Sequence, residues 1–179
     1  MDSSENEIFR AAIRGDREAF EMVIRTQSRA LFAIAYGILQ NREEAEDVVQ
    51  DTLVKAWKTR WRVRDAEKLP AWLGTIARHR AHDLLRRRRE VPLEENGPTL
   101  PVAEGADRDD EARHVQVQAA LSELPELHRA ALTLRYFEAL DYATIERTLG
   151  LTNGALRGIL GRALGTMRKR LRPALAALE

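Results

Sequence analysis

The sequence predicts an all-α protein of two small helical domains joined by an acidic, flexible linker. Apolar residues recur at helical spacing over most of the chain, and no stretch alternates apolar and polar residues as a half-buried strand would. Between residues 91 and 113, prolines, glycines and acids interrupt any periodicity. We therefore place a first domain at residues 1–90, the linker at 91–113 and a second domain at 114–179.

The first domain is expected to contain four helices, and capping residues indicate where they begin. Asn41 is a suitable N-cap, and the glutamates after it match the positive end of a helix. Pro70 suits the first turn of the last helix. The expected helices lie at about residues 8–15, 17–40, 42–57 and 69–89, with a polar stretch over 58–68.

The second domain is also expected to be helical, at about residues 117–124, 129–138, 142–149 and 153–171. Only the short turn Gly150–Thr152 separates the last two helices. A helix, a tight turn and a second helix form the pattern of a helix-turn-helix DNA reader. The hydroxyl of Thr152 can cap the final helix.

Composition excludes several classes of function. The chain has no cysteine and four scattered histidines, so we expect neither metal nor cofactor. Its acidic first residues lack the apolar region of a signal peptide, and no apolar run approaches the roughly 18 residues of a membrane span. Neither a phosphate-binding glycine loop nor a nucleophile–base pair is evident, so no enzyme is expected. These features predict a cytoplasmic recognition protein without membrane insertion.

Charge is strongly segregated although the net charge is only +1. Residues 78–89 contain six arginines and one acid, residues 90–111 contain eight acids and one base, and residues 157–172 contain six bases and no acid. Two basic blocks on either side of an acidic stretch predict two contacts with a polyanion.

The third expected helix carries a polar stripe beside its apolar one. Asp47, Gln50, Asp51 and Val54 fall at i, i+3, i+4 and i+7, so they share one face. The face is either a docking surface for a basic partner or the solvated side of a core helix.

Two strings favour the docking surface. Residues 45–51 read Ala-Glu-Asp-Val-Val-Gln-Asp, and the helix from Trp72 to Arg89 carries Trp-Leu, Ile-Ala-Arg and a terminal arginine run. Together they resemble the extracytoplasmic-function (group 4) sigma factors of the sigma-70 family, over about residues 15–90 and 114–172. The resemblance implies a sigma-two four-helix domain, a sigma-four helix-turn-helix domain, and a role in directing RNA polymerase to promoters.

The resemblance also implies partners and sites. The partners are core RNA polymerase, promoter DNA in double- and single-stranded form, and, as a candidate, an anti-sigma factor. The residues implied in polymerase binding are Asp47, Gln50 and Asp51. Those implied at the minus-ten element are Trp61, Arg62, Arg64, Lys68, Arg78, His79, Arg80 and Arg86. Those implied at the minus-thirty-five element are Thr152, Asn153, Arg157 and Arg162.

The second domain departs from the family pattern at several positions, and Thr144 in place of a common glutamate is one of them. Gly158 and Ile159 stand where a serine and an arginine are usual, and Glu146 replaces a small alanine. We therefore expect this domain to discriminate bases weakly, with Ile159 limited to contact with a thymine methyl group. The departures leave two alternatives open: a helix-turn-helix transcriptional regulator, and a sigma-like adaptor or decoy without full promoter recognition.

Overall fold

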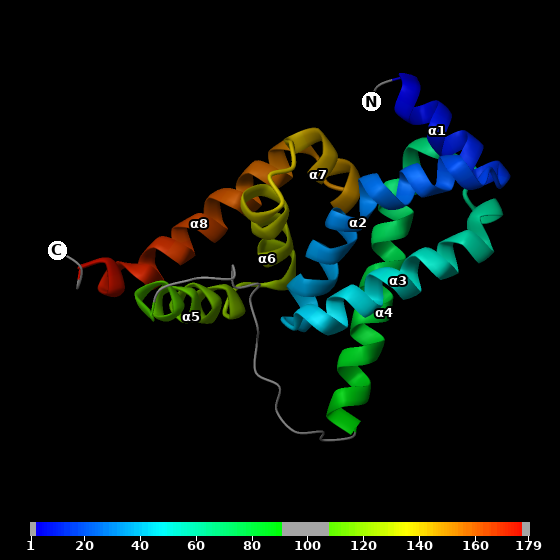
Figure 1. Cartoon of the computed structure of the whole chain (residues 1–179). Helices are drawn as coiled ribbons and strands as arrows, with labels where there is room; N and C mark the ends of the chain where they lie inside the picture. The colour runs from blue at the N-terminus through cyan, green and yellow to red at the C-terminus, as the bar shows by residue number, and fades with distance from the viewer. Residues whose placement is uncertain (1–2, 91–107, 177–179) are drawn as a thin grey trace.

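A computed structural model of the chain describes residues 3–90 and 108–176, and within these ranges the chain forms helices and turns without a strand (Figure 1). The first domain consists of α1 (Ser3–Arg14), α2 (Arg17–Leu39), α3 (Arg42–Thr59), the short 3₁₀ helices η1 (Arg60–Arg62) and η2 (Ala66–Lys68), and α4 (Leu69–Glu90). The second consists of α5 (Arg108–Ser122), α6 (Glu126–Leu132), η3 (Thr133–Phe137), α7 (Tyr142–Leu149) and α8 (Asn153–Ala176). The all-α prediction is confirmed.

The helices of the first domain begin where the sequence supplies capping side chains. The Asp16 carboxylate accepts the Ala19 backbone N–H at 2.9 Å, and the Asn41 side chain accepts that of Glu44 at 3.1 Å. Each bond satisfies one of the backbone donors left free at a helix start. Between α2 and α3, Gln40 adopts the left-handed conformation at φ 54°. That single residue turns the chain, so α3 packs back on α2.

Several elements differ from the sequence prediction. α1 begins at Ser3 instead of about residue 8, and α8 extends to Ala176 instead of about residue 171. α5 begins at Arg108, inside the predicted linker, and the rest of the linker lies outside the described residues. Acids dominate the first residues of α5, which suits the positive end of a helix and extends it. The helix predicted at 129–138 is instead α6, starting after Pro125, followed by one π-helical turn, η3. Apolar spacing does not distinguish a π turn from an α turn, so the sequence pattern missed it.

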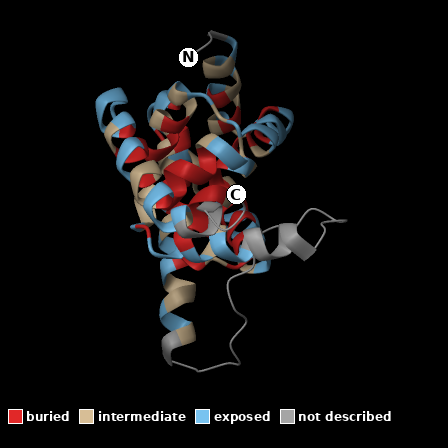
Figure 2. Cartoon of the chain, turned by 90° about the vertical axis from the view of Figure 1, so that its left-hand side faces the viewer, coloured by how far each residue is buried: buried red, intermediate tan, exposed pale blue. Residues whose placement is uncertain are grey.

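α2 lies at the centre of the first domain, with α1, α3 and α4 packed around it. Its residues Val23, Leu31 and Ile34 are almost inaccessible, as is Leu73 of α4. Figure 2 shows the buried residues gathered where the helices face one another. The buried cluster continues into the second domain, so one apolar core runs through both.

The two domains touch where α6 lies on α2 and α7 lies on α4. Glycines stand at both contacts. A Cβ atom on Gly37 would lie 3.3 Å from the backbone nitrogen of Ala130 in α6. A Cβ atom on Gly74 would lie 2.9 Å from the carbonyl oxygen of Thr148 in α7. Glycine in a helix interior costs about 1 kcal/mol relative to alanine, and here it permits close approach of the second domain.

Polar contacts also cross the boundary. Arg29 of α2 pairs with Glu138 at 2.6 Å, and Glu5 of α1 pairs with Arg147 of α7 at 2.6 Å. The Glu126 carboxylate at the start of α6 contacts two side chains of α4. Arg78 Nε lies 3.6 Å from one of its oxygens, and His82 Nε2 lies 3.1 Å from the other. All are partly exposed to solvent, where an ion pair contributes roughly 0–1 kcal/mol. Apolar burial therefore supplies most of the adhesion, and the pairs set the register.

We predict opposite effects for one substitution at two helical glycines. A Cβ at Gly161 meets nothing within 4 Å, so Gly161→Ala should raise the free energy of unfolding by up to about 1 kcal/mol. Gly74→Ala should lack this gain and loosen the domain contact, because its Cβ collides with a backbone oxygen. Chemical denaturation and small-angle scattering measure both effects. Equal stabilisation by the two changes, with no expansion for Gly74→Ala, would contradict the close contact.

Candidate nucleic-acid interface

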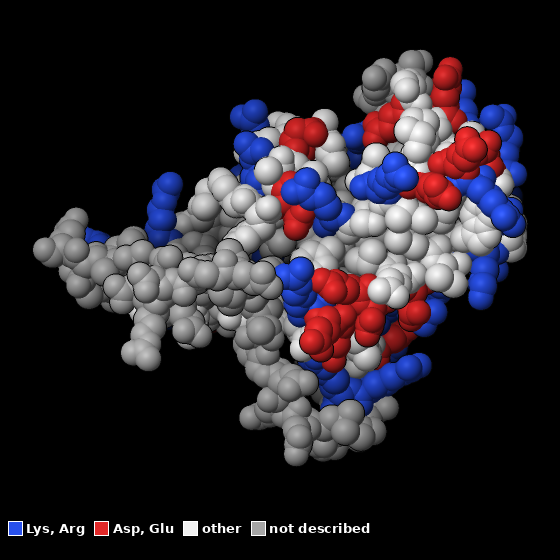
Figure 3. Space-filling view, in the orientation of Figure 1, with Lys and Arg blue, Asp and Glu red and all other residues white. Residues whose placement is uncertain are grey.

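The polar face of α3 is open to solvent. Asp47, Gln50, Asp51 and Val54 are all exposed, whereas Ala45, Val48, Val49 and Leu53 on the opposite stripe are buried. The two stripes follow from the helical period, because the apolar one packs on α2 and α4. Figure 3 shows acidic side chains gathered over α3, with Lys and Arg over the neighbouring end of α4. We call Asp47, Gln50, Asp51 and Val54 the acidic face.

The acidic face borders a hollow between α3 and α4. The hollow has a volume of about 330 Å³, and its lining includes Asp47, Gln50, Asp51, Arg80 and Arg87. Arg80 Nη1 lies 3.9 Å from a carboxylate oxygen of Asp51. The structure thus brings residues of the predicted polymerase site next to a predicted DNA-binding arginine, which the sequence did not indicate.

The loop between α3 and α4 displays an aromatic ring among cations. Trp61 is 66% exposed, and Arg62, Arg64 and Lys68 are exposed as well. Val63 and Ala66 are buried and anchor the loop between these side chains. An exposed aromatic ring among cationic side chains is what single-stranded nucleic acid requires, because bases stack and phosphates need neutralisation.

Sequence reasoning missed two arginines of α1 beside this loop. Arg10 and Arg14 line a cavity of about 300 Å³ together with Arg64 and Asp65. Their i, i+4 spacing places them on one face of α1, but only tertiary packing brings that face to the loop.

The arginines predicted on α4 have different partners. Arg78 faces the second domain through Glu126, at 3.6 Å. Arg86 bonds to Asp83 one turn earlier, and this hydrogen bond lowers the pKa of the Asp83 carboxyl. His79 is exposed. The predicted minus-ten residues of α4 therefore lie on several sides of the helix instead of on one surface.

The four residues predicted to read the minus-thirty-five element lie along α8 and the turn before it. The Thr152 hydroxyl accepts the Ala155 backbone N–H at 3.4 Å, and Asn153 donates to Glu146 at 2.5 Å. The Arg157 guanidinium lies 5.8 Å from the ring centre of Tyr142. Arg162 lies against Gly158, since a Cβ there would be 3.2 Å from its Nη1. Asn153, Arg157 and Arg162 are exposed.

Two departures from the family pattern have structural explanations. Ile159 is 6% exposed and belongs to the core, so the expectation that it contacts a thymine methyl group is wrong. The residue falls on the inner side of α8, and apolar burial holds it there. Gly158 leaves the space that the Arg162 side chain occupies. Glycine in place of the usual serine therefore does more than remove a hydroxyl group.

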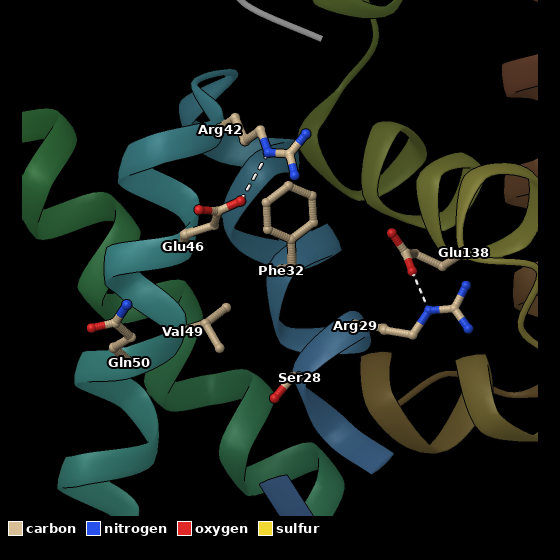
Figure 4. Close-up of a pocket in the computed structure, with 8 residues that line it drawn as sticks. All are labelled: Ser28, Arg29, Phe32, Arg42, Glu46, Val49, Gln50 and Glu138. Atoms are coloured by element: carbon tan, nitrogen blue, oxygen red, sulfur yellow. Dashed lines mark hydrogen bonds and ion pairs between the residues drawn. The ribbon is translucent and has the colours of Figure 1, made fainter. Parts of the chain in front are cut away.

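A larger cavity lies at the junction of the two domains (Figure 4). It has a volume of about 510 Å³, and Phe32 and Val49 give it an apolar wall. The pairs Arg29–Glu138 and Arg42–Glu46 stand at its edge, the second at 2.8 Å. Within the two described ranges, no cluster of three or more metal-ligating side chains occurs, and no helix is both long and apolar enough to cross a bilayer.

Comparison with known families identifies the family of both domains. Residues 23–91 match the family model described as Sigma-70 region 2, and residues 114–178 match the one described as Sigma-70, region 4. The chain belongs to the sigma-70 family. The acidic face, the loop and α4 all lie in region 2, and the helix-turn-helix lies in region 4.

Relatives of this sigma factor match it over most of its own length. It is 29% identical to the ECF RNA polymerase sigma factor SigM of Mycobacterium tuberculosis, covering 94% of this chain and 85% of the relative. It is also 29% identical to the "Probable RNA polymerase sigma factor RfaY" of Xanthomonas campestris, covering 89% of this chain but 42% of that longer relative. Named ECF relatives confirm the resemblance seen in the sequence.

Solved structures show the same fold. The sigma factor RpoE of Bartonella quintana, crystallised with the anti-sigma factor NepR, is 26% identical with a TM-score of 0.61, covering 86% of this chain and 96% of that one. CnrH, solved with the cytosolic domain of CnrY, has a TM-score of 0.65 at 23% identity, covering 96% of this chain and 99% of that one.

We predict that Asp141 makes the helix-turn-helix sensitive to acid. Its carboxylate accepts the backbone N–H of Thr144 at 2.9 Å and the hydroxyl at 2.8 Å, and these bonds lower its pKa from the ordinary 3.8. A lowered folded-state pKa stabilises the fold above pH 3.8, and this contribution is lost as pH falls through the folded value. Asp141→Ala should cost about 1 kcal/mol near neutral pH.

Thermal unfolding from pH 7 to pH 3 measures this effect. The difference between the original protein and Asp141→Ala should shrink at the acid end, whereas Asp141→Asn should cap α7 without that pH dependence. A constant difference across the range would show that the carboxylate charge is irrelevant.

Proposed function

We propose that this sigma factor directs core RNA polymerase to a specific set of promoters and helps to open the DNA there. The observation that carries the proposal is the presence, in one chain, of an exposed acidic face on α3 and a helix-turn-helix with exposed cations. A free-standing regulator needs the second feature but has no use for the first. A decoy without promoter recognition is disfavoured because Arg157 and Arg162 remain exposed on α8.

The proposed division of labour follows from side-chain chemistry. Asp47, Gln50 and Asp51 would dock on a basic surface of the polymerase. Trp61 and the cations of its loop would hold unstacked bases and phosphates of the melted strand, with Arg10 and Arg14 adding positive charge nearby. The exposed side chains at the start of α8 would enter the major groove of the upstream duplex.

The domains must separate for both elements to be read at once. Elements named minus-ten and minus-thirty-five lie about 25 base pairs apart, or roughly 85 Å at about 3.4 Å per pair. Here α7 touches α4, with Thr148 against Gly74. We therefore propose that the structure is a closed form, and that engagement of polymerase and promoter opens it. Opening would free Arg78 from Glu126.

Partners and compartment follow from the same proposal. The structures of Bartonella RpoE and of CnrH each contain a second protein, an anti-sigma factor in the case of RpoE. An anti-sigma factor that holds the closed form is a fitting regulator of this chain as well. The protein would act in the cytoplasm with the polymerase, as a specificity subunit rather than an enzyme.

We predict that reversing the charge of the acidic face weakens polymerase binding. The double variant Asp47→Arg/Asp51→Arg should lose most of its co-purification with core RNA polymerase, because two attractive contacts become repulsive. The matched control is Glu7→Arg/Glu21→Arg, which makes the same charge change at exposed positions of α1 and α2. Circular dichroism checks that both variants stay helical. Equal retention of the two variants on core enzyme would rule out this docking surface.

We predict that opening is measurable by energy transfer between two dyes. The chain has no cysteine, so Arg25→Cys in α2 and Gln116→Cys in α5 can be labelled specifically, and both positions are exposed. Transfer should be lower when core polymerase and promoter DNA are both present than in the free protein. The same labels on the Asp47→Arg/Asp51→Arg background should show no fall. Unchanged transfer during formation of a transcribing complex would contradict opening.

A further inference from the structure

We propose that Glu146 is a positioning residue that sets Asn153 to read an adenine in the upstream promoter element. This inference rests on the proposed function and deepens it. Asn153 is the first residue of α8, and its Nδ2 donates to Glu146 Oε1 at 2.5 Å. The bond crosses the tight turn of the helix-turn-helix, so it links α7 directly to the end of α8 that enters the groove.

Both partners of this bond are held by the surrounding backbone. The Glu146 carbonyl oxygen accepts the backbone N–H of Gly150, which caps α7 in the left-handed conformation at φ 68°. It also accepts the N–H of Leu151 at 2.9 Å. On the other side, the Thr152 hydroxyl caps α8. The side-chain bond therefore joins two fixed points, and Asn153 loses rotational freedom before DNA arrives.

The chemistry of the bond determines which way the Asn153 amide faces. An ionised carboxylate only accepts hydrogen bonds, so the amide must turn its NH₂ group toward Glu146. The carbonyl oxygen Oδ1 and the second N–H remain free for another partner, and Asn153 is exposed. Without Glu146, both orientations of the amide would be available.

One acceptor beside one donor is the complement of adenine in the major groove. Adenine presents an N6 donor and an N7 acceptor, guanine presents two acceptors, and cytosine presents a donor alone. Oδ1 can accept from N6 while the free N–H donates to N7. Glu146, unusual at this position in the family pattern, therefore contributes to base choice through its neighbour.

The competing interpretation is that Glu146 contacts a base itself. A carboxylate accepts from cytosine N4, so direct reading would select cytosine. The half-buried position of Glu146 and its bond to Asn153 favour the positioning role. Combining variants at the two positions separates these interpretations, because an indirect effect disappears once Asn153 is removed.

The experiment is run-off transcription with core RNA polymerase on a promoter library randomised in the upstream element, followed by sequencing of the transcribed templates. The original protein should prefer adenine at one position by about 5- to 150-fold, the range for a good bidentate contact. Asn153→Ala should abolish that preference, and Glu146→Ala should reduce it severalfold. Glu146→Gln should admit guanine or thymine, because glutamine can also donate and lets the amide turn over. The double variant Glu146→Ala/Asn153→Ala should match Asn153→Ala.

Controls separate base choice from folding and from the sigma activity itself. Glu123→Ala removes a carboxylate of the same domain, paired with Arg170 at 2.5 Å, and should leave the base profile unchanged. Thermal unfolding should show Glu146→Ala folded at the assay temperature. Three outcomes would each overturn the inference. The base profile of Glu146→Ala could be unchanged, or the original protein could show no upstream base preference. The third is a preference for cytosine that depends on Glu146 even when Asn153 is replaced by alanine. Transcription from the downstream element would still support the sigma function in those cases, whereas no transcripts at all would refute both.

Discussion

The close contact between the two domains is the constraint on which the rest of the structure depends. Gly37 and Gly74 lack the side chains that would hold α6 and α7 away from α2 and α4. Because these side chains are missing, the two helical layers share one apolar core, although each glycine weakens its own helix. The same contact decides that Arg78 faces Glu126 and that a cavity forms at the junction. Ion pairs at this boundary are too exposed to create the contact and serve to align it.

The contact also contains a feature that favours its release. Arg129 is buried at the base of α6, and burial lowers its pKa because the charged form loses water. Its charge acts on Tyr36 across the boundary, although burial dominates there and raises the pKa of the Tyr36 phenol to about 12. A buried guanidinium carries a desolvation cost that is recovered when solvent returns. The junction thus combines apolar adhesion with the desolvation cost of a buried cation, and that cost favours the proposed opening.

In α8, the identity of a residue and the direction in which its side chain points carry different information. Ile159 stands where an arginine is usual, which suggested a position on the DNA-facing surface, but its side chain is buried in the core. Gly158 and Glu146 appeared as losses in the sequence, yet each stands beside an exposed side chain of the predicted reading surface, Arg162 and Asn153. Departures from a family pattern thus gain meaning only from the neighbours that the fold gives them.

The sequence by itself determined the all-α class, most helix bounds, the two stripes of α3 and the family, because these depend on periodicity, capping residues and short motifs. It could not find the early start of α5, whose first residues are acidic and show no apolar periodicity. It also missed the π turn after α6, because its apolar spacing resembles that of an α turn. The tertiary structure alone brought Arg10 to the loop of Trp61 and Arg80 to Asp51. It also placed the second domain on Gly74. Contacts between residues far apart in the chain depend on how helices pack, and no local pattern encodes them.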